Sequence, residues 1–344
     1  MNKQLALLTL MLSLGATMPS SADTTTPYGI AIHGGAGTIS KAKLTEEQEQ
    51  AYRDKLEEAV NAGHKILAKG GDSLDAVKAA INILEDSPLF NAGYGAVYTF
   101  DGAHELDASV MDGKTLNAGA VAGVKHIKNP IDLALLVMNK SDHVMLSGSG
   151  AEEFALTQGM ALVPANTFDT DSRYQQLLDA KAKIKAAESA DKDFHASATS
   201  LDLDYKFGTV GAVALDKNGN LAAGTSTGGM TAKRFGRIGD SPVIGAGTYA
   251  ENGVCAVSAT GHGEYFIRYH VAGDICARIK YQQKNVIQAA DEVINQRLQQ
   301  AGGSGGVIAI DAQGNVATPF NTEGMYRASR VGKDEPVIMI WRDK

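Results

Sequence analysis

Apolar residues recur along the chain with two periods, one typical of helices and one typical of strands. Helical spacing predicts helices over residues 44–69, 72–87, 130–140, 150–158, 264–280 and 285–300. Alternation predicts strands over residues 28–37, 94–111, 119–124, 209–215, 220–226, 243–251 and 253–260, with a further hairpin over 305–322. Because both kinds of element occur on either side of one polar stretch, we expect one α/β core built from two chain segments.

The polar stretch runs from residue 169 to about 208 and has few large apolar side chains. Its first half can form a solvated helix. Its second half has the composition of an exposed, flexible linker. The chain therefore divides into a segment before Gly208 and a segment after it.

An internal repeat joins two parts of the second segment. Residues 208–230 align with residues 303–325 without a gap, and the matched pairs are Gly211 with Gly306, Asp216 with Asp311, Gly219 with Gly314, Asn220 with Asn315, Thr227 with Thr322 and Met230 with Met325. The shared pattern is that of a β-hairpin with an Asp-x-x-Gly-Asn turn. The hairpin itself is therefore no functional signal, whereas Thr209, which faces Ser304 in the alignment, is a difference.

The first 22 residues have the pattern of a secretory signal peptide. Lys3 precedes an apolar run over residues 5–14, and small residues end the segment at Ala22. We expect cleavage after Ala22 and an exported protein, periplasmic or secreted; a buried N-terminal helix is the alternative. No later stretch reaches the roughly 18 apolar residues of a membrane helix, so we expect no membrane anchor.

Charge and cysteine content narrow the possible ligands. The formal net charge is −7, the pI is near 5.6, and no run of Lys or Arg occurs, so a nucleic-acid partner is not expected and a small or peptidic ligand is. The two cysteines, Cys255 and Cys276, lie in a strand pattern and a helix pattern. The oxidising compartment of an exported protein permits the two cysteines to pair, but we favour two buried free thiols.

The Gly208-Thr209 bond is a candidate site of chemistry. A threonine hydroxyl is a weak nucleophile, and no His or Lys adjacent in sequence is placed to activate it. If the chain is cut after Gly208, the new α-amine of Thr209, with a pKa of about 8, takes the hydroxyl proton. Gly208 offers little steric hindrance and tolerates the strained backbone that attack on its carbonyl demands.

Seven blocks of sequence resemble the plant-type L-asparaginase and isoaspartyl peptidase family. They are "HGGAG" (33–37), "LEDSPLFNAGYGAV" (84–97), "HELDASVMDG" (104–113), "GTVGAVALDKNGNLAAGTSTGG" (208–229), "GRIGDSP" (236–242), "ATGHGE" (259–264) and "NTEGMYR" (321–327). The resemblance covers nearly all of the chain after residue 22, in order. It implies an α+β fold, the four-layer αββα sandwich of N-terminal-nucleophile hydrolases, self-cleaved into an α subunit (23–208) and a β subunit (209–344).

The resemblance also implies roles for individual residues. Thr209 is the expected nucleophile, Thr227 orients it, and Thr260 with the amide of Gly261 forms the oxyanion hole. The expected ligands of the substrate's α-carboxylate and α-ammonium groups are Arg237 and Asp240, with Gly263 and Asn91 in the same cavity. A structural sodium ion is expected on six backbone carbonyls, those of Leu84, Glu85, Ser87, Phe90, Ala92 and Tyr94. No cofactor is expected for the chemistry, and the expected assembly is a dimer of αβ pairs.

The expected function is that of a self-processing amidohydrolase that releases L-aspartate from β-aspartyl dipeptides, from L-asparagine, or from both. The sequence leaves that choice of leaving group open. A glycosylasparaginase is one alternative, although that branch typically has Asp where Gly208 stands. A non-catalytic exported protein that binds amino acids through Arg237 and Asp240 is the other. In this alternative Arg237 and Asp240 still bind, but the chain stays intact.

Overall fold

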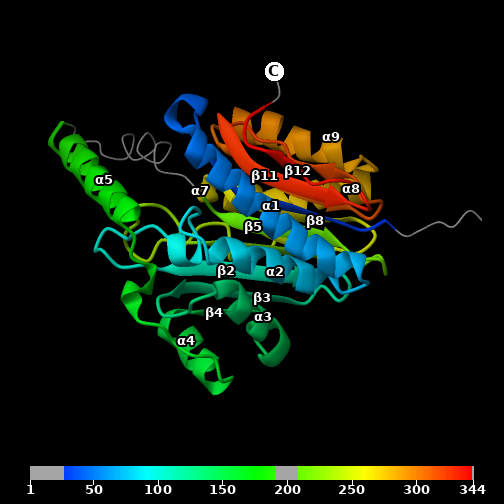
Figure 1. Cartoon of the computed structure of the whole chain (residues 1–344), viewed down its shortest axis with the longest axis horizontal. Helices are drawn as coiled ribbons and strands as arrows, with labels where there is room; N and C mark the ends of the chain where they lie inside the picture. The colour runs from blue at the N-terminus through cyan, green and yellow to red at the C-terminus, as the bar shows by residue number, and fades with distance from the viewer. Residues whose placement is uncertain (1–26, 191–207, 343–344) are drawn as a thin grey trace, which may run out of the picture.

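The computed structural model describes residues 27–190 and 208–342 (Figure 1). The predicted signal peptide and residues 191–207 of the predicted linker lie outside these ranges. In the described part, helices and strands occur in both segments of the chain, and strands from both segments share one sheet. The expectation of an α+β core formed by two segments is therefore confirmed.

The larger sheet has eight strands in the spatial order β12, β11, β1, β5, β6, β2, β3 and β4. Their bounds are Gly29–Gly37 (β1), Leu106–Asp112 (β2), Ala118–Val124 (β3), Met145–Ser147 (β4), Val210–Leu215 (β5), Leu221–Thr227 (β6), Gly324–Val331 (β11) and Val337–Met339 (β12). Neighbouring strands run antiparallel, apart from the parallel pair β3 and β4. This order places Thr209, just before β5, in the middle of the sheet.

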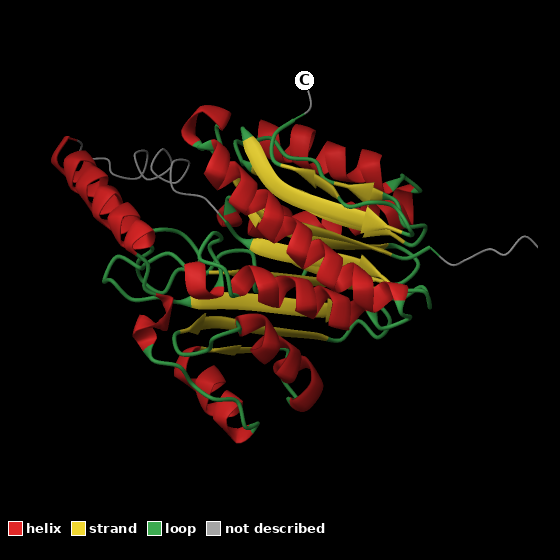
Figure 2. Ribbon diagram, viewed as in Figure 1, coloured by secondary structure: helices red, strands yellow, loops and turns green. Residues whose placement is uncertain are grey.

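Helices α1 (Glu46–Ala68), α2 (Ser73–Glu85) and α3 (Pro130–Lys140) pack against the larger sheet, and Figure 2 shows them in front of its strands. Helix α4 (Gly148–Thr157) packs against β3 and β4 at one edge of this sheet. Thr45 begins α1 with a capping box. Its hydroxyl accepts from the backbone amide of Gln48, and the Gln48 side chain accepts from the backbone amide of Thr45. The N-terminus of α2 is bound differently: Asp72 makes no side-chain cap, and the amide of Ser73 donates to Asp216.

The smaller sheet has four strands in the order β10, β9, β8 and β7. They span Thr248–Glu251 (β7), Cys255–Gly261 (β8), Gly305–Asp311 (β9) and Val316–Ala317 (β10). The helices α8 (Val271–Gln282) and α9 (Val286–Asp291) pack against it, and α9 continues into a π-helical segment, η4 (Glu292–Leu298).

The central strands β1, β5, β6 and β9 bury both of their faces, and the two sheets also pack on each other. On β5, Val210, Ala212 and Ala214 face the helices, whereas Val213 and Leu215 belong to a cluster with residues of β8 and β9. Every side chain of β5 is buried for this reason. The space between the sheets is therefore a second core, and Thr209 lies at one end of it.

The remaining described elements are short or peripheral. They are η1 (Lys41–Lys43), η2 (Gly93–Gly95), η3 (Ala165–Phe168), α5 (Asp171–Ala190) and α7 (Gly263–Tyr269). Helix α5 projects from the body of the protein in Figure 1 and confirms a helix in the first half of the polar stretch. In the described residues no helix is long and apolar enough to cross a bilayer.

Four details of the predicted elements were wrong. Residues 94–105 form no strand, and residues 243–247 belong to a turn before β7. The predicted helix over 264–280 is divided at His270, whose φ of 52° interrupts it. Strands β4, β11 and β12 were not predicted.

Cys255 and Cys276 form a disulfide bond, with Cα atoms 5.7 Å apart. The prediction of two free thiols was therefore wrong. Both residues are buried, as their patterns indicated, but one lies on β8 and the other on α8. The local patterns do not show that this helix packs on this strand, which is what brings the sulfur atoms together.

Candidate active site

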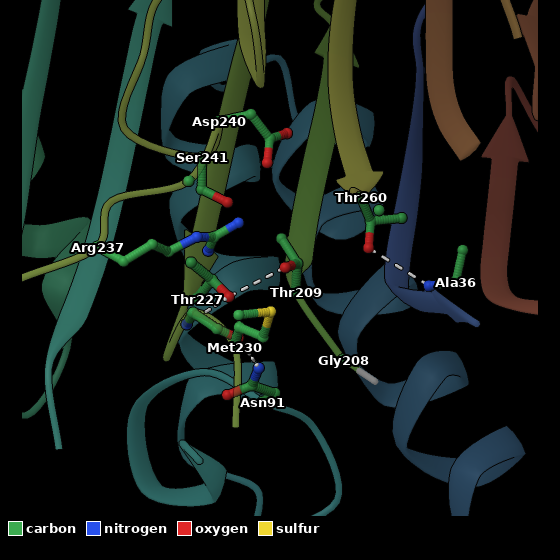
Figure 3. Close-up of a pocket in the computed structure, with 13 residues that line it drawn as sticks. Ala36, Asn91, Gly208, Thr209, Thr227, Met230, Arg237, Asp240, Ser241 and Thr260 are labelled. Carbon is green, nitrogen blue, oxygen red and sulfur yellow. Dashed lines mark hydrogen bonds between the residues drawn. The ribbon is translucent and has the colours of Figure 1, made fainter. Parts of the chain in front are cut away.

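A small cavity of about 30 Å³ opens beside Thr209, where several strands end (Figure 3). It is lined by residues from β1, β6 and β8, from the loop after α2 and from the loop between β6 and β7: Ala36, Asn91, Gly208, Thr209, Thr227, Gly229, Met230, Arg237, Gly239, Asp240, Ser241, Thr260 and Gly261. Every residue predicted for catalysis, cleavage or substrate binding lines this cavity, apart from Gly263, which adjoins it. Ala36 and Gly261, which are 225 residues apart in the sequence, thus meet at one cavity.

The hydroxyl of Thr209 contacts the hydroxyl of Thr227, the last residue of β6, at 3.0 Å. Thr227 also accepts from the backbone amide of Gly229 at 3.0 Å, so its own proton is available for the contact with Thr209. Because β5 and β6 pair directly, the sheet fixes this geometry. The structure therefore brings the expected nucleophile and its expected orienting partner together.

Thr260 and Gly261 lie at the end of β8, on the other side of Thr209 from Thr227 in Figure 3. The hydroxyl of Thr260 accepts from the amide of Ala36 at 3.3 Å, which leaves its proton free to donate. Gly261 has a φ of 149°, and a Cβ there would lie 2.4 Å from the carbonyl oxygen of Ser304. Only glycine fits this position, which holds the Gly261 amide at the cavity.

Arg237 and Asp240 lie in the loop between β6 and β7, next to the start of α7. The guanidinium group of Arg237 makes a bidentate contact with Glu264, at 2.9 Å through Nε and 3.0 Å through the second nitrogen. A Cβ on Gly263 would lie 2.8 Å from the Arg237 guanidinium and 3.0 Å from an Asp240 oxygen. Gly263 thus leaves room for the two charged groups, and Glu264 is a partner of Arg237 that the sequence did not identify.

Asn91 holds the loop after α2 against the cavity. Its side-chain amide donates to the carbonyl of Gly229 at 2.7 Å, and its side-chain oxygen accepts from Val97 at 2.9 Å. Its backbone amide donates to the carbonyl of Gly208 at 3.0 Å. Asn91 therefore lies in the cavity as predicted, but its contact with the Gly208-Thr209 bond comes from its backbone amide and not from its side chain.

His33, in the "HGGAG" block, is a site residue that sequence reasoning missed. Its Nδ1 lies 2.9 Å from the carbonyl oxygen of Thr209. Because that oxygen only accepts, Nδ1 must donate. Complete burial lowers the pKa of His33 to about 3, although the bond to Thr209 opposes the shift. The ring is therefore neutral. The "HGGAG" block that contains His33 was part of the family resemblance, but its residue pattern predicted only a strand.

The loop from α2 to η2 is curled tightly enough to gather backbone carbonyls. A Cβ on Gly93, which has a φ of 51°, would lie 2.4 Å from the Glu85 carbonyl oxygen, and one on Gly95 would lie 2.1 Å from that of Phe90. Oxygen atoms alone suit a hard cation, and the carbonyls of Glu85 and Phe90 are two of the six predicted to bind sodium; the ion itself stays a prediction. In the described residues, His, Cys, Asp and Glu side chains form no group of three that could hold a metal.

The Glu85 side chain points away from that loop into the core. It accepts from the Ser226 hydroxyl at 2.6 Å, from the Ile131 amide at 3.1 Å and from the Asn129 side chain at 3.1 Å. Burial raises the pKa of Glu85 to about 8, against the opposite effect of these donors. This carboxyl group therefore links the end of α2 to the residue before Thr227.

The family described as Asparaginase matches residues 26–340 of the chain. The match includes β1 with His33, the loop with Asn91, Thr209, and the two blocks that contain Arg237 and Thr260. It therefore spans the whole cavity as well as both sheets.

Curated relatives are similar over most of their length. The isoaspartyl peptidase of Salmonella typhimurium is 54% identical over 314 residues, which cover 91% of this chain and 98% of that protein. The isoaspartyl peptidase of Escherichia coli is 54% identical over 315 residues, covering 92% and 96%. The isoaspartyl peptidase/L-asparaginase of Mus musculus is 40% identical over 305 residues, covering 88% of each chain.

Proposed function

The chain belongs to the asparaginase family, and on that premise we propose that it is an isoaspartyl peptidase/L-asparaginase that cuts itself before Thr209. The observation that carries the proposal is the convergence on one cavity of two hydroxyls, at Thr209 and Thr227, with a charged pair, Arg237 and Asp240. A nucleophile beside groups that match an aspartyl substrate is what β-aspartyl hydrolysis requires.

The first step is cleavage of the Gly208-Thr209 bond. The hydroxyl oxygen of Thr209 attacks the Gly208 carbonyl carbon. The amide bond breaks as an ester forms between Gly208 and that oxygen, and the hydroxyl proton passes to the Thr209 nitrogen, which becomes the amine. The backbone amide of Asn91, 3.0 Å from the Gly208 carbonyl oxygen, stabilises the negative charge that develops on that oxygen. Water then hydrolyses the ester, which leaves Thr209 with a free α-amine and Gly208 with a carboxylate.

The second step is turnover by the processed enzyme. The α-amine of Thr209 takes the hydroxyl proton, and the oxygen attacks the substrate's β-carbonyl carbon. Thr260 and the Gly261 amide donate to the oxyanion, while Thr227 keeps the hydroxyl aligned. Ammonia or an amino acid leaves with a proton, and water hydrolyses the aspartyl ester to release L-aspartate.

Recognition of the aspartyl group uses opposite charges. The Arg237 fork matches a carboxylate bidentately, as its contact with Glu264 illustrates, so the substrate's α-carboxylate competes with Glu264 for it. Asp240 takes the α-ammonium group. The relatives' names favour this function over glycosylasparaginase.

We propose further that the two packed sheets with their helices are the αββα sandwich of N-terminal-nucleophile hydrolases. The α subunit then ends at Gly208 and the β subunit begins at Thr209. We also propose a dimer of αβ pairs. A sodium ion on the carbonyls of the loop after α2 would fix the segment that carries Asn91, and it takes no part in the chemistry.

Export is a proposal as well, and it rests on the signal pattern of residues 1–22. The Cys255–Cys276 disulfide supports it, because such bonds persist in oxidising compartments. Cell fractionation with N-terminal sequencing tests the proposal. A mature chain that begins at Met1 in the cytoplasm would contradict it.

The test of the proposed function is a denaturing gel of purified protein, with N-terminal sequencing and assays on β-aspartyl dipeptides, L-asparagine and a glycosylasparagine. We expect two fragments, the second beginning at Thr209, and one full-length band for Thr209→Ala. We also expect activity on the first two substrate classes. A lone full-length wild-type band after prolonged incubation excludes self-processing, and activity only on the glycosylasparagine favours the alternative hydrolase.

A further inference from the structure

A layer of hydroxyl groups lies directly beneath the catalytic cavity. Side chains two residues apart on a strand share a face, so Thr225 lies below Thr227 on β6, and Ser258 lies below Thr260 on β8. Thr248 of β7 and Ser109 of β2 complete the layer, and all four side chains are fully buried. One step deeper, Ala223 and Ala256 belong to the apolar core.

The members of this layer are joined in one unbroken chain that ends at His33. Ser109 lies 2.8 Å from Thr248, Thr248 lies 2.6 Å from Thr225, Thr225 lies 2.6 Å from Ser258, and Ser258 lies 3.0 Å from Nε2 of His33. Each hydroxyl has one proton to donate. The Ser109 hydroxyl donates its proton to the Ser241 carbonyl at 2.6 Å, and the Thr225 hydroxyl also lies 3.1 Å from the Gly247 carbonyl, so the far end of the layer does not set the state of His33.

The Thr209 carbonyl fixes the state of the imidazole ring. That oxygen only accepts, so Nδ1 carries the proton, and in the neutral ring Nε2 accepts from the Ser258 hydroxyl. Gly211 makes room for the contact, since a Cβ there would lie 2.0 Å from the Ser258 hydroxyl and 2.5 Å from Nε2 of His33.

The Thr209 carbonyl has a special importance once the chain is cut. Thr209 lies one residue before the paired part of β5, so no strand partner holds its carbonyl. Cleavage of the Gly208-Thr209 bond also removes the covalent link that holds Thr209 on its N-terminal side. We infer that His33, held by the hydroxyl layer, is a positioning residue that keeps the N-terminal Thr209 aligned for attack.

This inference rests on the proposed function, because it concerns a processed Thr209. Two substitutions separate the two nitrogens of the ring. Asn carries its amide nitrogen near the position of Nδ1, so His33→Asn keeps the donor to Thr209 and loses the contact with Ser258. Gln carries its amide group near Nε2, where its oxygen accepts from Ser258, so His33→Gln keeps the contact with Ser258 and loses the donor to Thr209.

The measurements are kcat and KM on a β-aspartyl dipeptide, the melting temperature, and the rate at which freshly made protein cuts itself. We expect kcat to fall about 10²-fold in His33→Gln and less than about 10-fold in His33→Asn, because a small misplacement of reacting atoms costs that much. KM stays within about 3-fold of wild type in both, because the groups that bind substrate are untouched. Self-cleavage follows the same order, because the same hydroxyl attacks.

His64 provides the matched control. It is also buried, and its Nε2 lies 2.7 Å from the Gly332 carbonyl, but it lies on α1 on the far side of the sheet from the cavity. His64→Gln and His64→Asn are expected to lower the melting temperature and leave kcat at the wild-type value. A kcat that followed the melting temperature in both sets would reduce His33 to a structural residue.

The outcomes separate the two claims. A wild-type protein that stays uncut and inactive overturns the proposed function, and this inference with it. An active wild type in which His33→Asn and His33→Gln lose kcat or self-cleavage equally, or lose activity through KM, overturns only the role of His33. Ser258→Ala adds a second test: it leaves Nε2 without its donor, and a wild-type kcat in this variant would show that the hydroxyl layer does not matter.

Discussion

The two hairpins of the internal repeat, residues 208–230 and 303–325, have nearly identical turns. In the first, Asp216 accepts from the amides of Asn218 and Asn220 and from the Asn220 side chain. In the second, Asp311 accepts from the amides of Gln313 and Asn315 and from the Asn315 side chain. The turn is therefore a unit of architecture that works equally well with and without a nucleophile.

The hairpins differ in what packs against the glycine near the start of each hairpin, Gly211 in the first and Gly306 in the second. At Gly211 the missing Cβ makes room for the polar pair His33 and Ser258, whereas at Gly306 it makes room for Met325 and Phe320. Thr225, in the hydroxyl layer, aligns with that same Phe320. The first hairpin thus rests on a polar layer and the second on an apolar one.

The segment around Ser304 is also fixed in a way that the segment around Thr209 is not. The side chain of Asn321 accepts from Gly305 at 2.8 Å and donates to Gly303 at 3.0 Å, which closes the strand end on both sides of Ser304. In the first hairpin the equivalent residue, Ser226, turns to Glu85 instead. One backbone pattern therefore becomes a candidate active site through its surroundings, and paired substitutions test this.

The largest effect is expected at the first residues of the two hairpins. Thr209→Ala removes the nucleophile and should abolish self-cleavage and lower activity by at least about 10⁴-fold. Ser304→Ala should leave both within about 3-fold of wild type, because nothing in its hairpin aligns or activates the hydroxyl. Gels and steady-state assays of both variants measure this. Loss of activity in Ser304→Ala would mean that the wrong hairpin was chosen.

The second effect concerns the threonines on the returning strands. Thr227→Val keeps the shape but removes the contact with Thr209, and kcat should fall about 10²-fold. Thr322→Val removes only a hydrogen bond to the Gly324 carbonyl and should leave kcat unchanged. Steady-state kinetics on processed protein decide this, and equal losses in the two variants would contradict the difference between the hairpins.

The third effect is the pH dependence of stability from Glu85. Its pKa is raised to about 8 in the folded protein, from 4.5 in the unfolded chain, so the folded state binds the extra proton between these values. The stabilisation is complete below about pH 4.5 and is lost as pH rises through about 8. Glu85→Gln should flatten this slope in melting temperatures measured from pH 5 to pH 8.5. Asn321→Ala, a change at the position of the other hairpin that is equivalent to Ser226, should leave the slope as it is.

The sequence predicted most of the helices and the strands of both hairpins, because periodicity is local. It also predicted which residues line the cavity, through blocks that resemble a family, although the strand order that joins them was not accessible. The misses have one cause. The disulfide, the Glu264 contact with Arg237 and the role of His33 depend on which elements pack together, and a single sequence does not contain that information. Strand β11 escaped for the same reason, because its partner β1 lies far away in the chain, and the described pairing of β12 is with β11.

The smallest effect returns to the two turns. Asp216 has one more partner than Asp311, because the amide of Ser73 at the start of α2 also donates to it at 3.2 Å. In Asp311→Asn the new amide group faces only the Asn315 side chain, which can turn over to offer its oxygen. In Asp216→Asn it also faces the Ser73 amide, a buried donor that cannot turn, and an unsatisfied group of this kind costs about 1–3 kcal/mol.

Asp216→Asn should therefore lower the free energy of unfolding by about 1–3 kcal/mol more than Asp311→Asn does. Denaturant unfolding of both variants in the Thr209→Ala background measures the difference without interference from cleavage. Equal losses would show that the contact with α2 contributes nothing. The first hairpin would then be anchored to the rest of the protein only near Thr209, through Ser226 and Glu85.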